Sequence, residues 1–382
     1  MKEFIPIELG NLIEFQRGFD LPKNEFVSGN IPVISSNGIL GYHNEAKVKA
    51  PGITIGRSGT VGLPHLIKED FFPHNTSLFV KDFKGNNIEY IFYLLKSLKL
   101  NEYKSGSGVP TMNRNHLHPI KVIATQNIES QTRMAKILST IDKKITLNNH
   151  LNDNLEQQAK VLYDYWFVQN IDEKWETVTL NSFIKNDKSG DWGKETAEGN
   201  YIVKVECIRG ADINGIIGKG EIKAPMRFIL EKNKHKFLSE NDLVIEISGG
   251  SPTQSTGRLA YVTKEVLERF ENPLICSNFC KAISLKDPNE LFYFVYSWNK
   301  AYENNIFFGF EGKTSGIKNL LFETLVSTYS IVKPDKKTLV EFQNVVSTLE
   351  KQRQKNLQQN QQLAALRDWL LPMLMNGQVK IS

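Results

Sequence analysis

Two stretches of this chain repeat one another, and both carry the heptad pattern of a coiled coil. The first begins ILSTIDKK at Ile137 and the second begins VVSTLEKQ at Val345. The Ser-Thr pairs that start at Ser139 and Ser347 set an offset of 208 positions between the copies. Apolar residues recur at alternating spacings of three and four, which is typical of a helix that packs against another helix. The sequence therefore predicts two long helices, at 127–167 and 335–375.

The predicted contact seam is mostly apolar, with polar residues at matching positions in both copies. A buried Asn on such a seam costs stability but fixes register and partner orientation, and Asn148 matches Asn356. Because neither helix can bury its apolar stripe alone, we expect the two to pack antiparallel. The predicted seam residues are Ile137, Ile141, Asn148, Leu151, Leu155 and Leu162 in the first helix, and Val345, Leu349, Asn356, Leu363, Leu366 and Leu370 in the second.

The repeat extends beyond the helices, which argues against the alternative of two unrelated surface helices. The loop SGSGVPTMNRNHL before the first helix matches GKTSGIKNLLFETL before the second at the same offset. Strand-like segments with turn residues precede both loops. We expect an α+β protein with two α/β domains, two long helices packed as an antiparallel coiled coil, and a pseudo-two-fold internal repeat. The predicted segments are a first globular domain at 1–125, a central helix at 126–170, a second globular domain at 171–333, and a C-terminal helix with its tail at 334–382.

The composition is that of a globular protein with a mild positive charge. Lys and Arg number 47 against 42 Asp and Glu, a net charge of +5, which permits nucleic-acid binding without requiring it. No segment reaches the ~20 apolar residues of a membrane span, and the N-terminus lacks the apolar run of a signal peptide. Three cysteines cannot form a paired disulfide framework. We therefore expect a soluble, cytoplasmic protein.

Two unlike domains on a shared helix pair would suit the recognition of double-stranded DNA. A helix of ~40 residues is ~60 Å long, whereas two-fold DNA readers contact half-sites about one helical turn, ~34 Å, apart. A rigid helix pair could thus set the distance between two short sequences and leave the bases between them unread. Because the two domains differ in sequence, the target should be asymmetric.

Glycine-rich and serine-rich loops supply the candidate DNA contacts. Asn and Arg match the edges of adenine and guanine, and small hydroxyl groups suit phosphates. Each cluster could instead be an ordinary turn, and Trp192 could stack on DNA or lie in a core. Arg57, Arg114 and Arg258 stand out, because a charged guanidinium in a turn-rich loop is poor packing material. The candidates are Ser36, Asn37, Arg57, Ser58, Thr60, Asn75, Ser107, Thr111, Asn113, Arg114 and Asn115 in the first domain, and Lys188, Trp192, Ser248, Arg258, Asn278, Lys313 and Thr314 in the second.

Motifs for catalysis or metal binding do not emerge from the sequence. There is no glycine-rich cofactor loop after a strand and no phosphate-binding Gly-Lys-Ser/Thr loop with the required spacing. Asp212, Glu221 and Lys223 imitate a nuclease site, but such a coincidence is common. Cys276 and Cys280 lack nearby partners at zinc-ligand spacing. We predict no catalytic residue and no metal; the alternatives are a fused endonuclease and methyltransferase, a coiled-coil adaptor, or an RNA-binding protein.

The chain resembles the specificity subunits of type I restriction-modification systems. The segments IESQTRMAKILSTIDKKITLNNHLNDNLEQQAKVLYDYWF and LRDWLLPMLMNGQVKI look like the helical regions of that family. IPVISSNGILGYHNEAKVKAPGITIGRSGT and GSGVPTMNRN look like one of its target-recognition domains, and GRLAYV and ICSNF like another. The chain departs from the family at Ala124 and Thr125, where a proline is common, which leaves the start of the first helix less certain.

The resemblance implies a subunit that binds DNA and partner proteins but no cofactor of its own. Two modification subunits would methylate adenine with S-adenosylmethionine by flipping the base out of the duplex. Restriction subunits would cut unmethylated DNA with ATP and Mg²⁺. Since the helices also serve as the docking surface in the family, the outer face of the first helix is a candidate interface, with Gln131, Arg133, Lys136, Lys143, Asn152 and Glu156.

Overall fold

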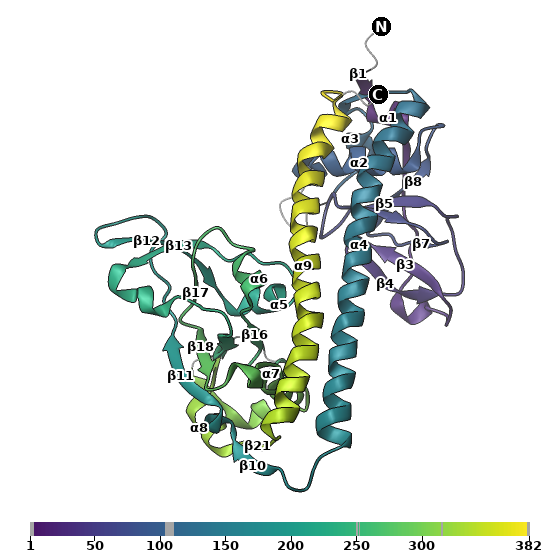
Figure 1. The fold of residues 1–382 in the computed structure, drawn as a ribbon. Helices are drawn as coiled ribbons and strands as arrows, with labels where there is room; N and C mark the ends of the chain where they lie inside the picture. Colours follow the sequence, from purple (N-terminus) through teal and green to yellow (C-terminus); the bar gives the residue numbers. More distant parts are fainter. Residues whose placement is uncertain (1–3, 104–110, 250, 252, 315, 380–382) are drawn as a thin grey trace. The chain divides into compact units, whose positions relative to one another are not determined.

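The computed structural model describes residues 4–103, 111–249, 251, 253–314 and 316–379. The chain forms two compact units, one made of Met1–Thr146 with Gln361–Ser382 and the other of Leu147–Asn360. Two long helices, α4 (Ile128–Asp164) and α9 (Lys336–Met375), each contribute to both units (Figure 1). The four-segment division expected from the sequence remains a prediction. No helix in the described part of the chain is long and apolar enough to cross a membrane.

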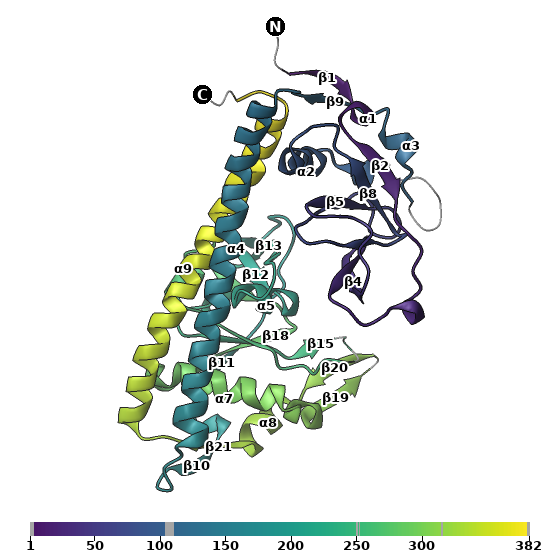
Figure 2. The same cartoon turned by 90° about the vertical axis from the view of Figure 1, so that its right-hand side faces the viewer.

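The first unit contains two sheets and a separate strand pair (Figure 2). The four-stranded sheet has the order β2 (Glu14–Arg17), β8 (Ser77–Asp82), β5 (Gly52–Gly56) and β6 (Pro64–Ile67). The three-stranded sheet has the order β4 (Gly38–His43), β3 (Ile31–Ser35) and β7 (Phe72–Pro73), while β1 (Ile5–Glu8) pairs with β9 (Lys121–Ala124). Its helices are α1 (Leu9–Leu12), α2 (Ile88–Ser97) and α3 (Arg114–Leu117), with 3-10 turns η1 (Lys23–Glu25) and η2 (Leu100–Tyr103).

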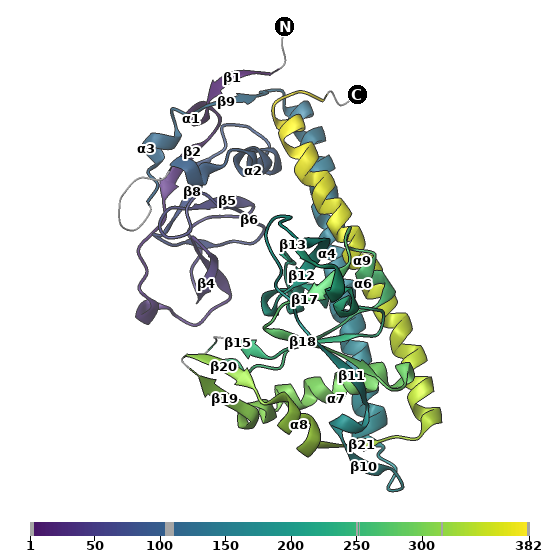
Figure 3. The same ribbon diagram turned by 90° about the vertical axis from the view of Figure 1, so that its left-hand side faces the viewer.

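The second unit repeats this topology and adds a sheet (Figure 3). Its four-stranded sheet runs β11 (Ile184–Ser189), β18 (Cys280–Leu285), β14 (Leu243–Glu246) and β16 (Leu259–Tyr261). Its three-stranded sheet has the order β13 (Met226–Leu230), β12 (Tyr201–Ile208) and β17 (Leu274–Cys276). The separate strand pair consists of β10 (Glu176–Thr179) and β21 (Ser330–Lys333). The added sheet has the order β15 (Ser248–Gly249), β20 (Ile317–Leu320) and β19 (Glu311–Thr314). Its helices are α5 (Ile213–Ile216), α6 (Lys264–Leu267), α7 (Leu291–Glu303) and α8 (Phe322–Thr328), with shorter turns η3 (Tyr165–Gln169), η4 (Leu180–Ser182), η5 (Gly210–Asp212), η6 (Glu231–Lys236), η7 (Pro288–Glu290) and η8 (Ile306–Phe310).

The duplication predicted from the sequence is thus confirmed at the level of topology. In each unit one strand pair is parallel, β3 with β7 and β12 with β17, at the same place in the three-stranded sheet. The long helices begin at Ile128 and Lys336, which are related by the expected offset of 208. Mixed strands and helices in both units give the expected α+β class.

Each unit buries apolar residues of both long helices in its own core. In the first unit Leu138 of α4 and Leu374 of α9 are fully buried against the core that contains α2. In the second, Tyr163 of α4 and Phe342 of α9 lie in the core that contains α7. A buried side chain of this size contributes about 1.5–3 kcal/mol, so packing rather than intrinsic helix propensity stabilises these helices.

Between the apolar stretches, the helix pair has a polar centre. Asn148 donates to the side-chain oxygens of Gln359 and Asn360 at 2.8 and 2.9 Å. Asn356 donates to Asn152 at 2.8 Å. Partners on α9 thus move toward lower numbers as α4 advances, which is the antiparallel arrangement predicted from the sequence. The expected burial of Asn148 and Asn356 is confirmed.

Three predicted seam residues are not buried, so the predicted seam is wrong at these positions. Leu151, Val345 and Leu366 are 42%, 43% and 44% exposed. Asn152 and Val346 are buried in place of their neighbours. A helix with 3.6 residues per turn drifts relative to a strict heptad, and the globular domains also select which face is buried. Among the other predicted seam residues, Ile141 is buried and the remainder are half-buried: Ile137, Leu155, Leu162, Leu349, Leu363 and Leu370.

The predicted outer face of α4 also needs correction. Gln131 is fully buried, because its side chain bonds the backbone of Asn87 and of Thr125. Asn152 belongs to the polar centre of the helix pair. Neither side chain is therefore available on an outer face.

Candidate nucleic-acid interface

In the first unit, several predicted DNA contacts gather around the turn between β7 and β8. The carbonyl of Thr76 accepts the N–H groups of Arg57 at 2.8 Å and Ser58 at 3.1 Å, just after β5. Ser58 also forms an antiparallel bridge with Thr111. The backbone N–H of Ser36 donates to the Thr76 hydroxyl at 3.4 Å. We call Ser36, Arg57, Ser58, Asn75, Thr76 and Thr111 the first loop cluster.

Other predicted residues of the first domain lie on neighbouring turns. Asn75 donates its side chain to Asp20, and its carbonyl accepts from Arg57 at 3.4 Å. Asn113 caps α3, whereas the exposed Arg114 makes one 3.4 Å bond to the carbonyl of Phe15. The backbone N–H of Met112 donates to the carbonyl of Arg57 and thereby ties this segment to the first loop cluster. Exposed side chains are found at Asn37, Thr60, Asn113, Arg114 and Asn115, while Ser107 lies outside the described residues.

The second unit has a corresponding group around the turn between β17 and β18. The carbonyl of Phe279 accepts the N–H groups of Ile247 at 2.9 Å and Ser248 at 3.2 Å. The Ser248 hydroxyl donates to the side chain of Asn319 at 2.5 Å. Asn278 and Phe279 are exposed at the tip of the turn. We call Ile247, Ser248, Asn278, Phe279 and Asn319 the second loop cluster.

Lys313 and Thr314 lie nearby in the chain, on β19. Their backbones pair with Lys318 and Ile317 of β20. Since Asn319 of the second loop cluster also belongs to β20, the hairpin of these two strands adjoins that cluster.

Two predicted basic contacts of the second domain serve the fold instead. Arg258 forms a two-pronged ion pair with Glu246, at 2.8 and 2.6 Å. Both side chains are largely buried, and the hydrogen bond to Glu246 raises the pKa of Arg258. Lys188 donates to Asp242 at 2.7 Å and to the carbonyl of Phe237 at 3.0 Å. The argument that a charged loop residue is poor packing material is therefore wrong for Arg258, because a buried carboxylate compensates its charge.

Trp192 is neither a core residue nor an open stacking surface. It is 37% exposed, and the guanidinium of Arg227 lies 3.9 Å from its ring centre. Arg227 also pairs with Glu195 at 3.1 Å. A cation–π contact of this kind contributes about 0.5–2 kcal/mol, so one face of the indole is already covered.

The residues that imitate a nuclease site do not converge. Asp212 is buried and receives hydrogen bonds from the guanidinium of Arg209 and the backbone of Lys223, whereas Glu221 pairs with the Lys223 side chain at the surface. All three cysteines are buried thiols, and burial raises the pKa of Cys207 and Cys276 to about 12. Within the described ranges, no group of three or more His, Cys, Asp or Glu residues could hold a metal ion.

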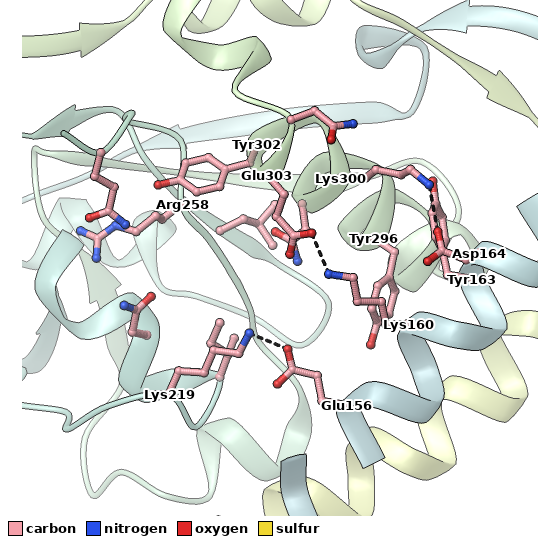
Figure 4. A pocket seen from close by; sticks show the side chains of 16 residues that line it. Glu156, Lys160, Tyr163, Asp164, Lys219, Arg258, Tyr296, Lys300, Tyr302 and Glu303 are labelled. Atoms are coloured by element: carbon pink, nitrogen blue, oxygen red, sulfur yellow. Dashed lines mark hydrogen bonds and ion pairs between the residues drawn. The ribbon is translucent and has the colours of Figure 1, made fainter. Parts of the chain in front are cut away.

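A polar pocket of about 360 Å³ lies in the second unit between α4, α5 and α7 (Figure 4). Its lining includes Tyr163, Tyr296 and Tyr302. Ion pairs cross it at Lys160–Glu303 (2.7 Å), Lys219–Glu156 (2.5 Å) and Lys300–Asp164 (2.9 Å). Because these opposite charges already neutralise one another, the pocket suits the attachment of α4 to its domain better than the capture of a charged ligand.

Phe279 and Thr76 lie in turns that the sequence marks, but neither is among the individual candidate residues. An aromatic residue beside a strand is most often core, and a threonine in a turn carries no distinctive signal. Only their shared role, as carbonyl acceptors for two consecutive N–H groups, distinguishes them.

Comparisons with known proteins agree on one family. Residues 1–157 match the family model described as type I restriction modification DNA specificity domain. The specificity subunit of the type I restriction enzyme EcoprrI from Escherichia coli is 27% identical over 151 residues, which cover 38% of this chain and 37% of that protein. The specificity subunit of MjaIX from Methanocaldococcus jannaschii is 23% identical over 324 residues, which cover 77% of this chain and 69% of that protein.

A solved structure shares the whole fold. The S subunit of a type I restriction-modification system from M. genitalium aligns with 99% of this chain and 97% of its own, with a TM-score of 0.64 and 16% identity. Residues 1–157 thus match the DNA specificity domain of type I restriction-modification systems, and the chain is similar in sequence to specificity subunits of such systems and shares the fold of a solved one.

Proposed function

We propose that this chain is the DNA-reading subunit of a type I restriction-modification complex and recognises a bipartite, asymmetric target in double-stranded DNA. One observation carries the proposal: the same two-sheet framework occurs twice, with different side chains at corresponding loops. A repeated framework suits two half-sites on one duplex. Different side chains on that framework would give each half-site its own sequence.

The exposed polar side chains of the loops are the proposed readers of DNA. Asn278 in the second unit and Asn113 and Asn115 in the first present amides that match adenine, and Arg114 presents a guanidinium that matches guanine. Hydroxyl groups in the loop clusters, such as those of Ser58 and Ser248, suit contacts to phosphate oxygens that position the protein without reading sequence.

The helix pair is the proposed link between the two half-sites. At 1.5 Å per residue the 37 residues of α4 span about 55 Å and the 40 residues of α9 about 60 Å. These lengths exceed the ~34 Å of one DNA turn. A continuous helix pair could therefore hold the spacing between half-sites while the intervening bases go unread.

The catalytic steps belong to proposed partners. The relatives are specificity subunits of type I restriction enzymes, which supports assembly with other subunits of such an enzyme. We propose that these are two modification subunits together with restriction subunits, and that the complex acts in the cytoplasm. The modification subunits would use S-adenosylmethionine, and the restriction subunits would use ATP and Mg²⁺. On α4 the proposed docking face keeps Arg133, Lys136 and Lys143, which retain exposed surface, whereas Glu156 pairs with Lys219 and Arg353 within the second unit.

Selection from a random duplex library tests the proposal. The chain, co-purified with its modification subunit, should enrich two short conserved blocks separated by an unread gap. Arg114→Ala should lower the preference for one base pair of the first block by about 1–3 kcal/mol. Lys121→Ala is the matched control, because Lys121 is an exposed basic residue of β9 outside the loop clusters and the docking face, and it should leave the enriched sequence unchanged.

The rival function, a self-contained methyltransferase or nuclease, is tested with the chain alone. Incubation with labelled S-adenosylmethionine and plasmid DNA should yield neither methylated nor cut product. Robust methyl transfer by the isolated chain would reject the specificity-subunit function.

A further inference from the structure

The two loop clusters share one backbone framework. In each, a single turn carbonyl accepts two consecutive N–H groups from the end of a strand: Thr76 holds Arg57 and Ser58, and Phe279 holds Ile247 and Ser248. Thr76 and Phe279 thus occupy the same position in their units. By the same correspondence, Asn75 matches Asn278.

Further contacts confirm this correspondence. Each turn is closed by a backbone hydrogen bond of 2.9 Å, which the Ser77 N–H donates to the carbonyl of His74 and the Cys280 N–H donates to the carbonyl of Ser277. The bridge between Ser58 and Thr111 in the first unit corresponds to the pairing of Ser248 with Asn319 in the second.

A glycine passes each turn at very close range. A Cβ on Gly18 would come within 2.2 Å of the His74 carbonyl oxygen, and one on Gly190 within 1.9 Å of that of Ser277. Only glycine permits such an approach. The framework therefore fixes the backbone of both turns, and only their side chains differ.

The side chains at the matched positions differ in their surroundings. In the first unit the Thr76 hydroxyl lies 3.1 Å from His74 Nδ1 and accepts the N–H of Ser36, while Asn75 is bonded to Asp20. In the second unit Asn278 is exposed, and Phe279 is 54% exposed although its carbonyl is fixed by two hydrogen bonds. The framework thus holds an aromatic ring at the surface beside an exposed amide.

We propose that Phe279 is a specificity-determining residue and that its turn reads an A·T pair in the second half-site. This inference rests on the proposed function. An amide such as that of Asn278 pairs with the N6 and N7 edge of adenine, and an apolar ring contacts the C5-methyl group of thymine, both in the major groove. The two side chains therefore favour the same base pair. The matching position holds Thr76, which is half-buried and whose single methyl group offers much less apolar surface than the exposed ring of Phe279.

The test compares variants of the full chain, purified with its modification subunit, by selection from a random duplex library. Phe279→Ala should reduce the preference for A·T at one position of the second half-site about 5- to 100-fold and leave the first half-site unchanged. Phe279→Leu keeps an apolar contact, so its preference for A·T at that position should lie between those of the unmodified chain and Phe279→Ala. Tyr165→Ala is the matched control, because Tyr165 is an equally exposed aromatic, at 56%, in the same unit.

A change on the DNA isolates the methyl contact. Replacing the thymine of that pair with deoxyuracil removes only the C5-methyl group. The replacement should weaken binding by the unmodified chain and have no effect on Phe279→Ala. The comparison of thymine with deoxyuracil uses the unmodified chain, so its result does not depend on whether the variant folds.

The possible outcomes separate the inference from the function on which it rests. If the unmodified chain enriches no sequence, the proposed function fails and the inference fails with it. A different result overturns the inference alone: the unmodified chain enriches a bipartite target, Phe279→Ala enriches the same target, and DNA with deoxyuracil binds the unmodified chain as tightly as DNA with thymine.

Discussion

The polar centre of the helix pair offers a direct test of how these helices are stabilised. Asn152 and Asn356 are both buried and joined by one hydrogen bond of 2.8 Å. The Asn152 side-chain nitrogen otherwise has no hydrogen-bond partner among the described residues. Replacing both residues with leucine removes the donor and its acceptor together. It also removes the bond of 3.0 Å from the Gln352 amide to Asn356, but Gln352 is exposed and can bond to water instead, so no new buried orphan is created. The variant Asn152→Leu/Asn356→Leu should therefore be more stable than the original chain.

The expected gain follows from four contributions. Loss of the hydrogen bond lowers the free energy of unfolding by about 0.5–1.5 kcal/mol, while removal of the unpaired amide group raises it by about 1–3 kcal/mol. Burying two leucines contributes about 1.5–3 kcal/mol each, and the tighter fit costs about 1–3 kcal/mol. At the midpoints of these ranges the net stabilisation is about 3.5 kcal/mol, which for a unit of roughly 200 residues raises Tm by about 7–14 °C.

Calorimetry of the single and double variants supplies the assay. Asn152→Leu alone leaves the Asn356 amide without its acceptor, so the double variant should exceed the sum of the single effects, as expected for residues in contact. Asn154→Leu is the control, because Asn154 is exposed on α4 and lies outside the polar centre, and its effect should stay within about 0.5 kcal/mol. A double variant that melts at or below the temperature of the original chain would refute the reasoning.

Further predictions concern single sites. Phe342→Ala should destabilise the second unit by about 3–5 kcal/mol, measured by urea unfolding, because the ring is fully buried. Burial lowers the pKa of His118, whose Nε2 accepts the N–H of Phe15 at 3.1 Å. The neutral imidazole therefore stabilises the fold fully above about pH 6.5, and this stabilisation is lost as the pH falls through the folded-state pKa. His118→Gln should flatten the dependence of Tm on pH between about 5 and 7. Arg258→Ala should destabilise the second unit by about 3–5 kcal/mol, since it leaves Glu246 buried and unpaired, without altering the DNA sequence selected.

The helices were predictable because their signal is local and occurs twice. Heptad spacing and the offset of 208 located both helices within one or two residues of Ile128 and Lys336. The exact buried face was less predictable. Leu151 and Asn152 are neighbours, and the heptad favours the leucine, but the packed structure buries the asparagine. Burial there depends on contacts with a helix some 200 positions away in sequence, which periodicity does not describe.

The loop residues show a similar limit. The sequence identifies Arg258 and Lys188 as charged residues in or beside turn-rich segments, but it does not show that Glu246 and Asp242 bind them. The sequence also marks Asn278 through its turn, but not the adjacent Phe279. An exposed phenylalanine and a core phenylalanine look alike in a sequence, and only the hydrogen bonds of the folded turn distinguish them.

The two frameworks predict that the half-sites are read independently. Each unit has its own apolar core, and the loop clusters draw their backbone hydrogen bonds from residues of their own unit. Effects of substitutions that share no partners add, whereas those of residues in contact do not. Arg114→Ala and Phe279→Ala should therefore combine additively, each changing one block of the selected sequence by the same factor alone or together. A non-additive double variant would mean that DNA binding couples the two units, and the chain would then read its target as one continuous surface.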